Sequence, residues 1–520
     1  MWTLFLSLIL IFSFVLQPGL TCAQTYSDLW GKNGDSWTPY SRLPDFSYAG
    51  YAQGERPIPK VQQVTNIKLF GAVGDGETDD SKAFLKALST VKRGAIYIPP
   101  GRYKITRIIE VNRSNVVLRG AGPSKTILYF PLPLNKIEPD WGTTTSGKRT
   151  SEYSWSGGFV WFNGWIEQKK LARVIDESSR GSRVLKVSST KRLKTGQWIQ
   201  ISLKDDRKKS LFNHLYSDDP GNTDAIKPAS HKIRLVCRIT SIMQDGIVLD
   251  RPLRCDVKLE WKPRIRSFKP SVSECGIENL CFEFPKRKYD GHFSELGFNA
   301  IAFDHVYNCW ARNIKIVNAD SGIFAKGRFC TVQGVTFELQ GAETTKNNLF
   351  GHHGIFLQGD DNLFTAFNFK TRFIHDISVS RCSGNVISNG KGVDLCFDHH
   401  KRAPFANLFT NIDIGKGSRM WRSGGGANLG RHCGAHETFW NIRAERSQNY
   451  PGSFYGPDSM NLIAVKTDSS SEKALDKMWF EDISPDGIQP QSLHEAQLSK
   501  RLSTFPQHNM PFVCEGHPLQ

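Results

Sequence analysis

Short runs of apolar residues alternate with polar ones along most of the chain, at the two-residue period of β-strands. In the second half these runs share one texture, in which a turn residue, often Asn, leads an apolar residue at every second position. Ile314 and Val335 hold equivalent places 21 residues apart, which is the length of one coil (335 − 314). Coils of this kind bury a continuous core when they stack on their neighbours. The runs lie at 276–282, 311–318, 332–337, 375–379, 407–414 and 439–443.

Three segments depart from this texture. Residues 81–91 carry apolar side chains at helical spacing, and 492–502 is predicted as a short terminal helix. Four short alternating strands around a long polar segment predict a small antiparallel β module inserted between coils. The predicted organisation is a signal peptide at 1–23, an extension at 24–63, the first coils and cap at 64–139, the inserted module at 140–265, the main stack at 266–485, and a helix and tail at 486–520.

The start of the chain predicts export. Residues 1–16 are almost entirely apolar and are followed by the small-residue pattern Thr21-Cys22-Ala23. The run is shorter than the ~20 residues that span a membrane, so a cleaved signal peptide is favoured over a membrane anchor. Of eleven cysteines, ten follow this segment; they permit disulfides in an oxidising compartment, although several lie in apolar strands where Cys acts as a small hydrophobe. Asn112-Arg113-Ser114 predicts glycosylation at Asn112.

The charge predicts an anionic partner. The formal net charge is +17 and the isoelectric point is near 9.3. An exported protein with this balance is expected to face an acidic polysaccharide, whereas nucleic acid fits export poorly and no later segment is long enough for membrane insertion. The alternative is a basic surface that serves solubility alone.

The segment from Ile67 to Gly122 contains Phe70-Gly71-Ala72-Val73-Gly74-Asp75-Gly76-Glu77-Thr78-Asp79-Asp80, then a short helix and Gly- and Pro-bounded strands. This segment resembles the opening of the pectate-lyase superfamily. The resemblance implies an all-β fold, a right-handed parallel β-helix with an N-terminal cap helix. It leaves the reaction open, because such folds host lyases, hydrolases, epimerases and proteins without activity. Asp75, Asp79 and Asp80 are interpreted as structural.

The densest polar chemistry lies between residues 352 and 436, which hold seven of the fourteen histidines. In Val393 to Asp398 the apolar positions are expected to point inward, which turns Asp394 and Asp398 outward. The same parity places Asp376 outward and His375 inward. The candidate catalytic residues are His375, Asp376, Lys391, Asp394, Asp398, His399, His400, Lys401 and Arg402, and the candidate substrate-binding residues are His352, His353, Arg372, Arg419 and Arg422.

These residue types suit β-elimination from a uronic acid, which needs a cation for the carboxylate, a base for the C5 proton and an acid for the leaving oxygen. The expected function is therefore a polysaccharide lyase; the alternatives are a non-catalytic matrix or glycan-binding protein and a glycoside hydrolase. The hydrolase is disfavoured, because polygalacturonase-type hydrolases on this fold carry a paired D-D, then G-H-G, then R-I-K. Here His352-His353-Gly354 precedes the pair Asp360-Asp361, and no R-I-K motif follows. Asp360 and Asp361 are candidate Ca²⁺ ligands, a three-histidine zinc site lacks a recognisable spacing, and a salt-bridged turn network remains the structural alternative.

Overall fold

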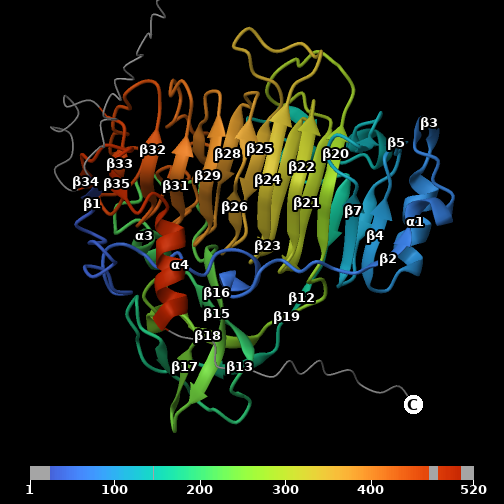
Figure 1. Cartoon of the computed structure of the whole chain (residues 1–520). Helices are drawn as coiled ribbons and strands as arrows, with labels where there is room; N and C mark the ends of the chain where they lie inside the picture. Colours follow the sequence, from blue (N-terminus) through green and yellow to red (C-terminus); the bar gives the residue numbers. More distant parts are fainter. Residues whose placement is uncertain (1–23, 145, 468–477, 505–520) are drawn as a thin grey trace, which may run out of the picture.

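Two parallel sheets run along the molecule (Figure 1). The computed structural model describes residues 24–144, 146–467 and 478–504, so the predicted signal peptide and Cys514 lie outside the described residues. Within each sheet, strands pair in parallel with the strands of neighbouring coils; Ile314, for example, lies between Leu280 and Val335. This repeated pairing makes a parallel β-helix and confirms the predicted fold.

The larger sheet has sixteen strands and the smaller sheet has seven. The larger sheet contains β2 (Gln63–Asn66), β3 (Asp75–Asp79), β4 (Gly94–Ile98), β5 (Gly101–Lys104), β7 (Val116–Gly120), β8 (Thr126–Tyr129), β20 (Gly276–Glu283), β22 (Trp310–Val317), β24 (Thr331–Glu338), β26 (Leu363–Thr365), β27 (Asn368–Phe369), β29 (Val386–Gly392), β31 (Leu408–Asp413), β32 (Thr438–Arg443), β33 (Asn461–Val465) and β34 (Trp479–Glu481). The smaller sheet contains β6 (Ile109–Val111), β11 (Val160–Asn163), β21 (Asn299–Tyr307), β23 (Ser321–Arg328), β25 (His353–Leu357), β28 (His375–Val379) and β30 (Phe397–His399).

The remaining elements lie outside the two parallel sheets. A six-stranded antiparallel sheet forms the inserted module, with β13 (Lys170–Arg173), β14 (Val184–Lys186), β15 (Trp198–Lys204), β16 (Lys232–Ile242), β17 (Gly246–Leu249) and β18 (Arg264–Ser267). Three short pairs are β1 (Thr25–Tyr26) with β35 (Ile488–Gln489), β9 (Trp141–Thr143) with β10 (Arg149–Ser151), and β12 (Ile166–Glu167) with β19 (Lys269–Pro270). The helices are α1 (Ser81–Thr90), α2 (Leu134–Ile137), α3 (Ser210–His214) and α4 (Leu493–Thr504), with 3-10 turns η1 (Tyr51–Gly54), η2 (Ile67–Phe70), η3 (Glu152–Ser154) and η4 (Leu259–Trp261).

The recurring asparagines lie where the strands of the larger sheet bend. Asn279, Asn313, Asn411 and Asn441 all have positive φ, between 53° and 58°. Asparagine tolerates this left-handed conformation better than most residues. The side chains also bond between coils, because Asn313 Nδ2 donates to Asn279 Oδ1 at 2.8 Å. The Asn-led texture of the sequence is therefore the signature of one bend per coil.

A ladder of buried amides connects four coils. Asn362 Nδ2 donates to Asn385 Oδ1 at 3.0 Å, and Asn385 Nδ2 donates to Asn407 Oδ1 at 3.0 Å. Asn407 Nδ2 donates to Glu437 Oε1 at 2.7 Å, which ends the ladder. Each side chain bonds both the coil before it and the coil after it, so the ladder specifies the register of stacking.

The nine described cysteines are free and buried. Cys275, Cys309 and Cys330 precede the paired residues of three successive coils, at the start of the row that the amide ladder continues. They are packed among the interior side chains. The prediction that cysteines are small hydrophobes agrees with this placement, and the expected disulfides are not present among the described residues.

The acidic motif near the start of the helix is structural. Asp75 accepts hydrogen bonds from the backbone of Glu77 and Thr78, and Asp80 accepts from the backbone of Val73 and Gly74. These bonds order the loop that precedes α1, whose apolar face lies in the core. Hydrogen bonding to the charged form lowers the pKa of Asp75 to about 2. A catalytic role is not needed to explain the motif.

The segment before β2 runs along the helix in the direction opposite to the order of the coils (Figure 1). It begins beside the last coils, where β1 pairs with β35. Midway, Tyr51 N donates to Thr331 Oγ1 at 2.8 Å, and the segment ends where β2 pairs with β4 of the first coils. Its buried aromatic residues Trp30, Phe46 and Tyr51 pack against the stack and anchor the segment along it.

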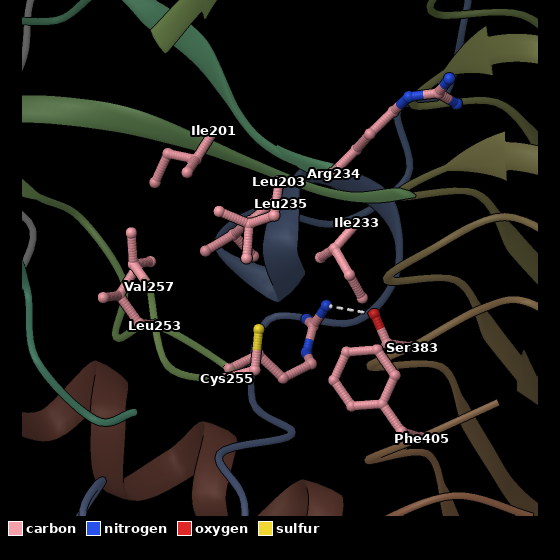
Figure 2. A pocket seen from close by; sticks show the side chains of 11 residues that line it. Ile201, Leu203, Ile233, Arg234, Leu235, Leu253, Cys255, Val257, Ser383 and Phe405 are labelled. Atoms are coloured by element: carbon pink, nitrogen blue, oxygen red, sulfur yellow. Dashed lines mark hydrogen bonds between the residues drawn. The ribbon is translucent and has the colours of Figure 1, made fainter. Parts of the chain in front are cut away.

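The inserted module docks on the middle coils. Arg251 and Arg254 of the module both bind the buried Asp361, with Arg251 Nη2 at 2.8 Å from Oδ1. Figure 2 shows Ser383 and Phe405 facing the module across a cavity of about 10 Å³. The antiparallel sheet begins at β13 rather than near residue 140, because β11 already belongs to the smaller parallel sheet.

This docking also corrects the expected Ca²⁺ site. The two module arginines neutralise Asp361, while Asp360 accepts bonds from Arg328 Nη2 at 2.9 Å and from Ser383 N at 2.9 Å. A Ca²⁺ ion needs six to eight free oxygen ligands, and these carboxylates are committed to cations of the chain itself. Asp360 and Asp361 are therefore structural ion-pair residues.

We expect Asn385→Ala to lower the free energy of unfolding by about 1–3 kcal/mol, because it leaves ladder partners unsatisfied. Asn163→Ala is the matched control: the Asn163 side chain is exposed, and its Nδ2 donates to Glu110 Oε1 at 2.8 Å. Chemical denaturation of both variants measures the difference. Equal stability of the two variants would show that the ladder does not stabilise the stack.

We expect Asp361→Asn to lower the free energy of unfolding by about 3 kcal/mol or more, because two buried arginines lose their counter-charge. Thermal unfolding is measured with excess Ca²⁺ and with a chelator. The loss should be the same in both. A wild-type stability that rises with Ca²⁺, and a variant that does not respond, would restore the Ca²⁺ interpretation.

Candidate functional site

One row of side chains crosses the outer face of the smaller sheet. The strand register aligns Trp161, Ala302, Phe324, Phe356, Ser378 and Asp398. The first four form an apolar cluster separate from the interior core. Five steps of ~4.8 Å give this row a length of about 24 Å. The row therefore changes from aromatic to polar along the direction in which the coils stack.

A cluster of histidines surrounds the polar end of this row. His353 Nδ1 lies 3.0 Å from Ser378 Oγ, and the His353 ring stacks on the His375 ring with centroids 5.2 Å apart. Asp398 is fully buried and holds His400 Nδ1 at 2.9 Å. Its second neighbour is His375, whose Nδ1 lies 3.2 Å from Asp398 Oδ2. Strands β25, β28 and β30 thus each contribute to one polar cluster.

Two loops cover this cluster. His292 comes from the loop before β21, and its Nε2 lies 2.9 Å from His352 Nε2. On the other side, Gly424 lies directly against the rings of His375 and His400, and its backbone N donates to Asp398 at 2.6 Å. A side chain at position 424 would collide with both rings. Glycine at this position is what lets the loop close over the cluster.

Burial separates the protonation behaviour of the histidines. Burial lowers the pKa of His375 to about 3; the Asp398 carboxylate acts in the opposite direction, and the charges of neighbouring histidines add to the lowering. Burial also holds the pKa of His353 well below its ordinary value. Burial acts in the same direction on His400, but the Asp398 carboxylate outweighs it and raises that pKa. His400 is therefore the member of the cluster that carries a proton most readily.

A basic cavity of about 660 Å³ is lined in part by residues 417–422, which lead into the Gly424 loop that covers the cluster. It is open to solvent and polar, and Arg422 links it to the histidines, since the Arg422 charge contributes to the lowered pKa of His292 and His375. Trp421 gives the cavity an aromatic wall. The lining residues are Asn347, Leu349, Arg372, Gly417, Ser418, Arg419, Met420, Trp421, Arg422, Arg446, Ser447, Gln448 and Asn449.

The arginines of this cavity divide into two kinds. Arg419 is only 7% exposed and donates to Asp376 and to the backbone oxygens of Phe373 and Asp394. Arg372 donates to Asp394 at 3.0 Å and is partly exposed. Among the described residues, the guanidinium groups of Arg422 and Arg446 make no hydrogen bond or ion pair. The predicted set of binding arginines is thus brought together, but Arg419 is a structural member of it.

The predicted parity of β28 is wrong. Asp376 is fully buried, where it accepts from Phe373 N at 2.8 Å and Cys396 N at 2.9 Å and pairs with Arg419. His375, predicted to point inward, instead joins the outer cluster. Asp394, predicted to point outward, is 1% exposed and bound by Arg372 and Ser418. The alternation fails because both carboxylates lie where the coil turns, at the edge of a strand or outside it.

The four remaining candidates lie in different surroundings. His399 is fully buried and points to the interior, where its Nδ1 lies 2.8 Å from the Tyr455 hydroxyl. Lys391 is exposed on β29 of the larger sheet, away from the strands that carry the cluster. Lys401 and Arg402 are half-buried after β30 with positive φ. Lys401 adjoins the glycine loop at Gly425, beside His400.

Sequence reasoning missed three contributors. His292 lies before the dense window of histidines, yet its loop folds back onto His352. Glu295 is buried behind His352, and burial raises its pKa to about 7. Arg446 lies beyond the window. No local pattern in the sequence marks them, because each reaches the site through the stacking of distant coils.

Two surface expectations can be placed. Asn112 lies between β6 and β7 and its side chain is exposed, so the predicted glycosylation site is accessible. No helix among the described residues is long and apolar enough to cross a membrane.

Comparison with known families matches two parts of the chain. Residues 64–195 match the family described as rhamnogalacturonase A/epimerase, pectate lyase-like. Residues 373–510, which include His375, His400 and most residues that line the cavity, match a domain of unknown function, DUF4955. The first match contains the acidic motif that carries the predicted resemblance.

The similar proteins cover only small parts of this chain. The chain is 42% identical over 65 residues to the pre-neck appendage protein of Bacillus phage B103, which is 12% of this chain and 7% of that protein. It is 38% identical over 72 residues to mannuronan C5-epimerase AlgE6 and 36% identical over 72 residues to alginate lyase 7, both of Azotobacter vinelandii, in each case 12% of this chain and 8% of the relative. The chain thus spans less than a tenth of these relatives.

Solved structures with related architecture share little sequence with this chain. The tailspike protein gp49 from Pseudomonas phage LKA1 has a TM-score of 0.43 at 12% identity, covering 74% of this chain and 65% of that one. An alginate lyase from Paenibacillus sp. str. FPU-7 has a TM-score of 0.36 at 9% identity, covering 78% and 92%. The strand pairing and the match over residues 64–195 together give the conclusion: this chain is a parallel β-helix protein that resembles the pectate-lyase superfamily.

Proposed function

We propose that this chain is an exported polysaccharide lyase that cleaves a uronic-acid-containing glycan by β-elimination. The observation that carries the proposal is the basic cavity, in which the Arg422 and Arg446 guanidinium groups make no ion pair among the described residues. The positive charge of Arg422 also acts on His292 and His375 of the histidine cluster. An excess of 17 positive charges in the whole chain supports an acidic partner.

The arrangement supplies each requirement of the reaction. Arg422 or Arg446 binds the C6 carboxylate and stabilises the charge that develops when C5 loses its proton. His400, oriented by Asp398, accepts the C5 proton. The electron pair left at C5 forms the C4–C5 double bond, and the C4–O bond breaks. The leaving oxygen takes a proton from Lys401 or water, so atoms and charge balance without another reactant.

The row of aromatic residues supports an extended substrate. Trp161 is partly exposed at one end of the row, and the polar cluster lies at the other. The similar proteins named mannuronan C5-epimerase and alginate lyase have names that refer to uronic-acid polymers. Their likeness covers 12% of this chain, so it supports the substrate class and not the site.

The alternatives differ in what they need from the site. A glycoside hydrolase needs two available carboxyl groups, whereas Asp376, Asp394 and Asp398 are each buried among basic or hydrogen-bonding partners. A matrix or glycan-binding protein needs only the basic cavity, and it is the second candidate. Catalysis separates it from the lyase.

We expect salt-sensitive binding of acidic glycans, because exposed charges are screened over ~8 Å at physiological ionic strength. Arg422→Ala should weaken binding roughly tenfold, since a hydrogen bond between charged groups contributes about 1.5–3 kcal/mol. Lys186→Ala removes a charge on the module, where Lys186 pairs with Asp176, and should change binding little. Affinity is measured at low and high salt with alginate, pectate and glycosaminoglycan chains. Absence of binding at low salt would contradict an acidic partner.

We expect incubation with the correct uronic-acid polymer to produce unsaturated ends, detected by their ultraviolet absorbance. His400→Ala should lower kcat by about 10²–10⁴-fold and leave the dissociation constant nearly unchanged, because proton transfer acts in the transition state. Lys186→Ala is again the control. Binding without any unsaturated product, across the same polymers, would favour the matrix-protein alternative.

A further inference from the structure

Three histidines from separate segments bring their ring nitrogens together beneath the covering loops. They are His292 in the loop before β21, His352 just before β25, and His375 at the start of β28. One nitrogen from each lies within 4.8 Å of the others. The Nε2 atoms of His292 and His352 are 2.9 Å apart. If one ion bound both nitrogens at about 2.0–2.1 Å, the N–metal–N angle would be roughly 90°.

The central histidine makes no hydrogen bond with either ring nitrogen among the described residues, although its Nδ1 lies 3.2 Å from Asp398 Oδ2. His375 is 4% exposed, and both its ring nitrogens lack a hydrogen-bond partner among the described residues. An imidazole always has at least one N–H donor, and a buried donor that makes no hydrogen bond costs about 1–3 kcal/mol. A native protein rarely leaves such a group unexplained. A ligand to His375 removes the cost.

Carboxylates lie behind two of the three histidines. Asp398 Oδ2 is 3.2 Å from His375 Nδ1, on the side of the ring away from Nε2. Glu295 Oε2 is 3.9 Å from His352 Nδ1, and neither of these two atoms has a hydrogen-bond partner among the described residues. Metal-binding histidines characteristically present one nitrogen to the ion and the other to a carboxylate. The Phe293 ring, stacked on His292 at 3.7 Å, holds the third ligand in place.

We infer that His292, His352 and His375 bind one divalent first-row transition-metal ion, with Zn²⁺ as the ion that suits three imidazoles best. Imidazole ligands favour Zn, Cu, Fe and Ni over Ca and Mg. Three protein ligands leave a fourth position for water or a substrate oxygen, as in sites that are not purely structural. His292 is exposed, which gives the ion a route of entry.

This site is separate from the lyase proposal and has its own readout. The rings of His375 and His400 are 5.4 Å apart, so a bound ion would face the same substrate as the His400 and Asp398 pair. Metal binding does not require that a substrate be cleaved. A chain that binds zinc and has no lyase activity, or the reverse, would test the two proposals independently.

The experiment uses the full chain, stripped with a chelator and reloaded with Zn²⁺. Metal analysis after gel filtration should give one zinc per chain, and Co²⁺ should give the visible absorption of a low-coordinate nitrogen site. His352→Ala and His375→Ala should lower zinc affinity more than ~100-fold, and Glu295→Gln should lower it by about 10–100-fold. His305→Ala is the control, because His305 is exposed on β21 and its ring pairs with Asp304, away from the three ligands.

Circular dichroism and thermal unfolding establish that each variant is folded. If the two buried variants do not fold, His292→Ala, in an exposed loop, provides the same test. Zinc below one tenth of an equivalent in the wild-type chain would overturn the proposal. So would equal affinity of His292→Ala and His305→Ala, because the ligands would then lie elsewhere.

Discussion

The in-register stacking of coils is the constraint on which the rest of this structure depends. Each coil supplies half of its neighbour's backbone hydrogen bonds, at a spacing of ~4.8 Å. A polar side chain that enters the interior therefore needs a partner in the next coil. The amide ladder from Asn362 to Glu437 satisfies that requirement, and the three cysteines at the start of the same row avoid it by being apolar.

The same constraint builds the outer cluster. Residues 22 apart in sequence, such as His353 and His375, become neighbours because their coils stack in register. Several charged histidines in one place would repel one another, but burial lowers their pKa values and keeps most of them neutral. Asp398 lies between His375 and His400 and supplies the negative charge that lets His400 hold a proton.

Charged side chains inside the stack are paired with opposite charges, whereas two arginines in the cavity are not paired within the described part of the chain. Asp361, Asp376 and Asp394 are buried beside arginines, which makes those pairs part of the frame. The attraction within a buried ion pair does little more than offset the desolvation of its two charges. Removing one partner strongly destabilises the fold, because the other charge stays buried without a counter-charge. Such pairs therefore hold the module and the turns in register. Among the residues that the structure describes, Arg422 and Arg446 form no ion pair, so they leave positive potential in the cavity. The division explains why only some of a dense group of charges is available to a ligand.

The sequence by itself determined the β-helix, the inserted antiparallel module and the terminal helix, because period-two runs, Asn bends and the motif at Asp75 are local signals. Arg372, Arg419 and Arg422, which the sequence marked as candidates, line one cavity because they flank the same coils. The sequence did not determine which carboxylates face outward, because Asp376 and Asp394 lie at turns where strict alternation ends. It did not find His292, Glu295 or Arg446 either. Those residues meet the site through loops that fold over neighbouring coils, and only the tertiary structure decides which loop covers which coil.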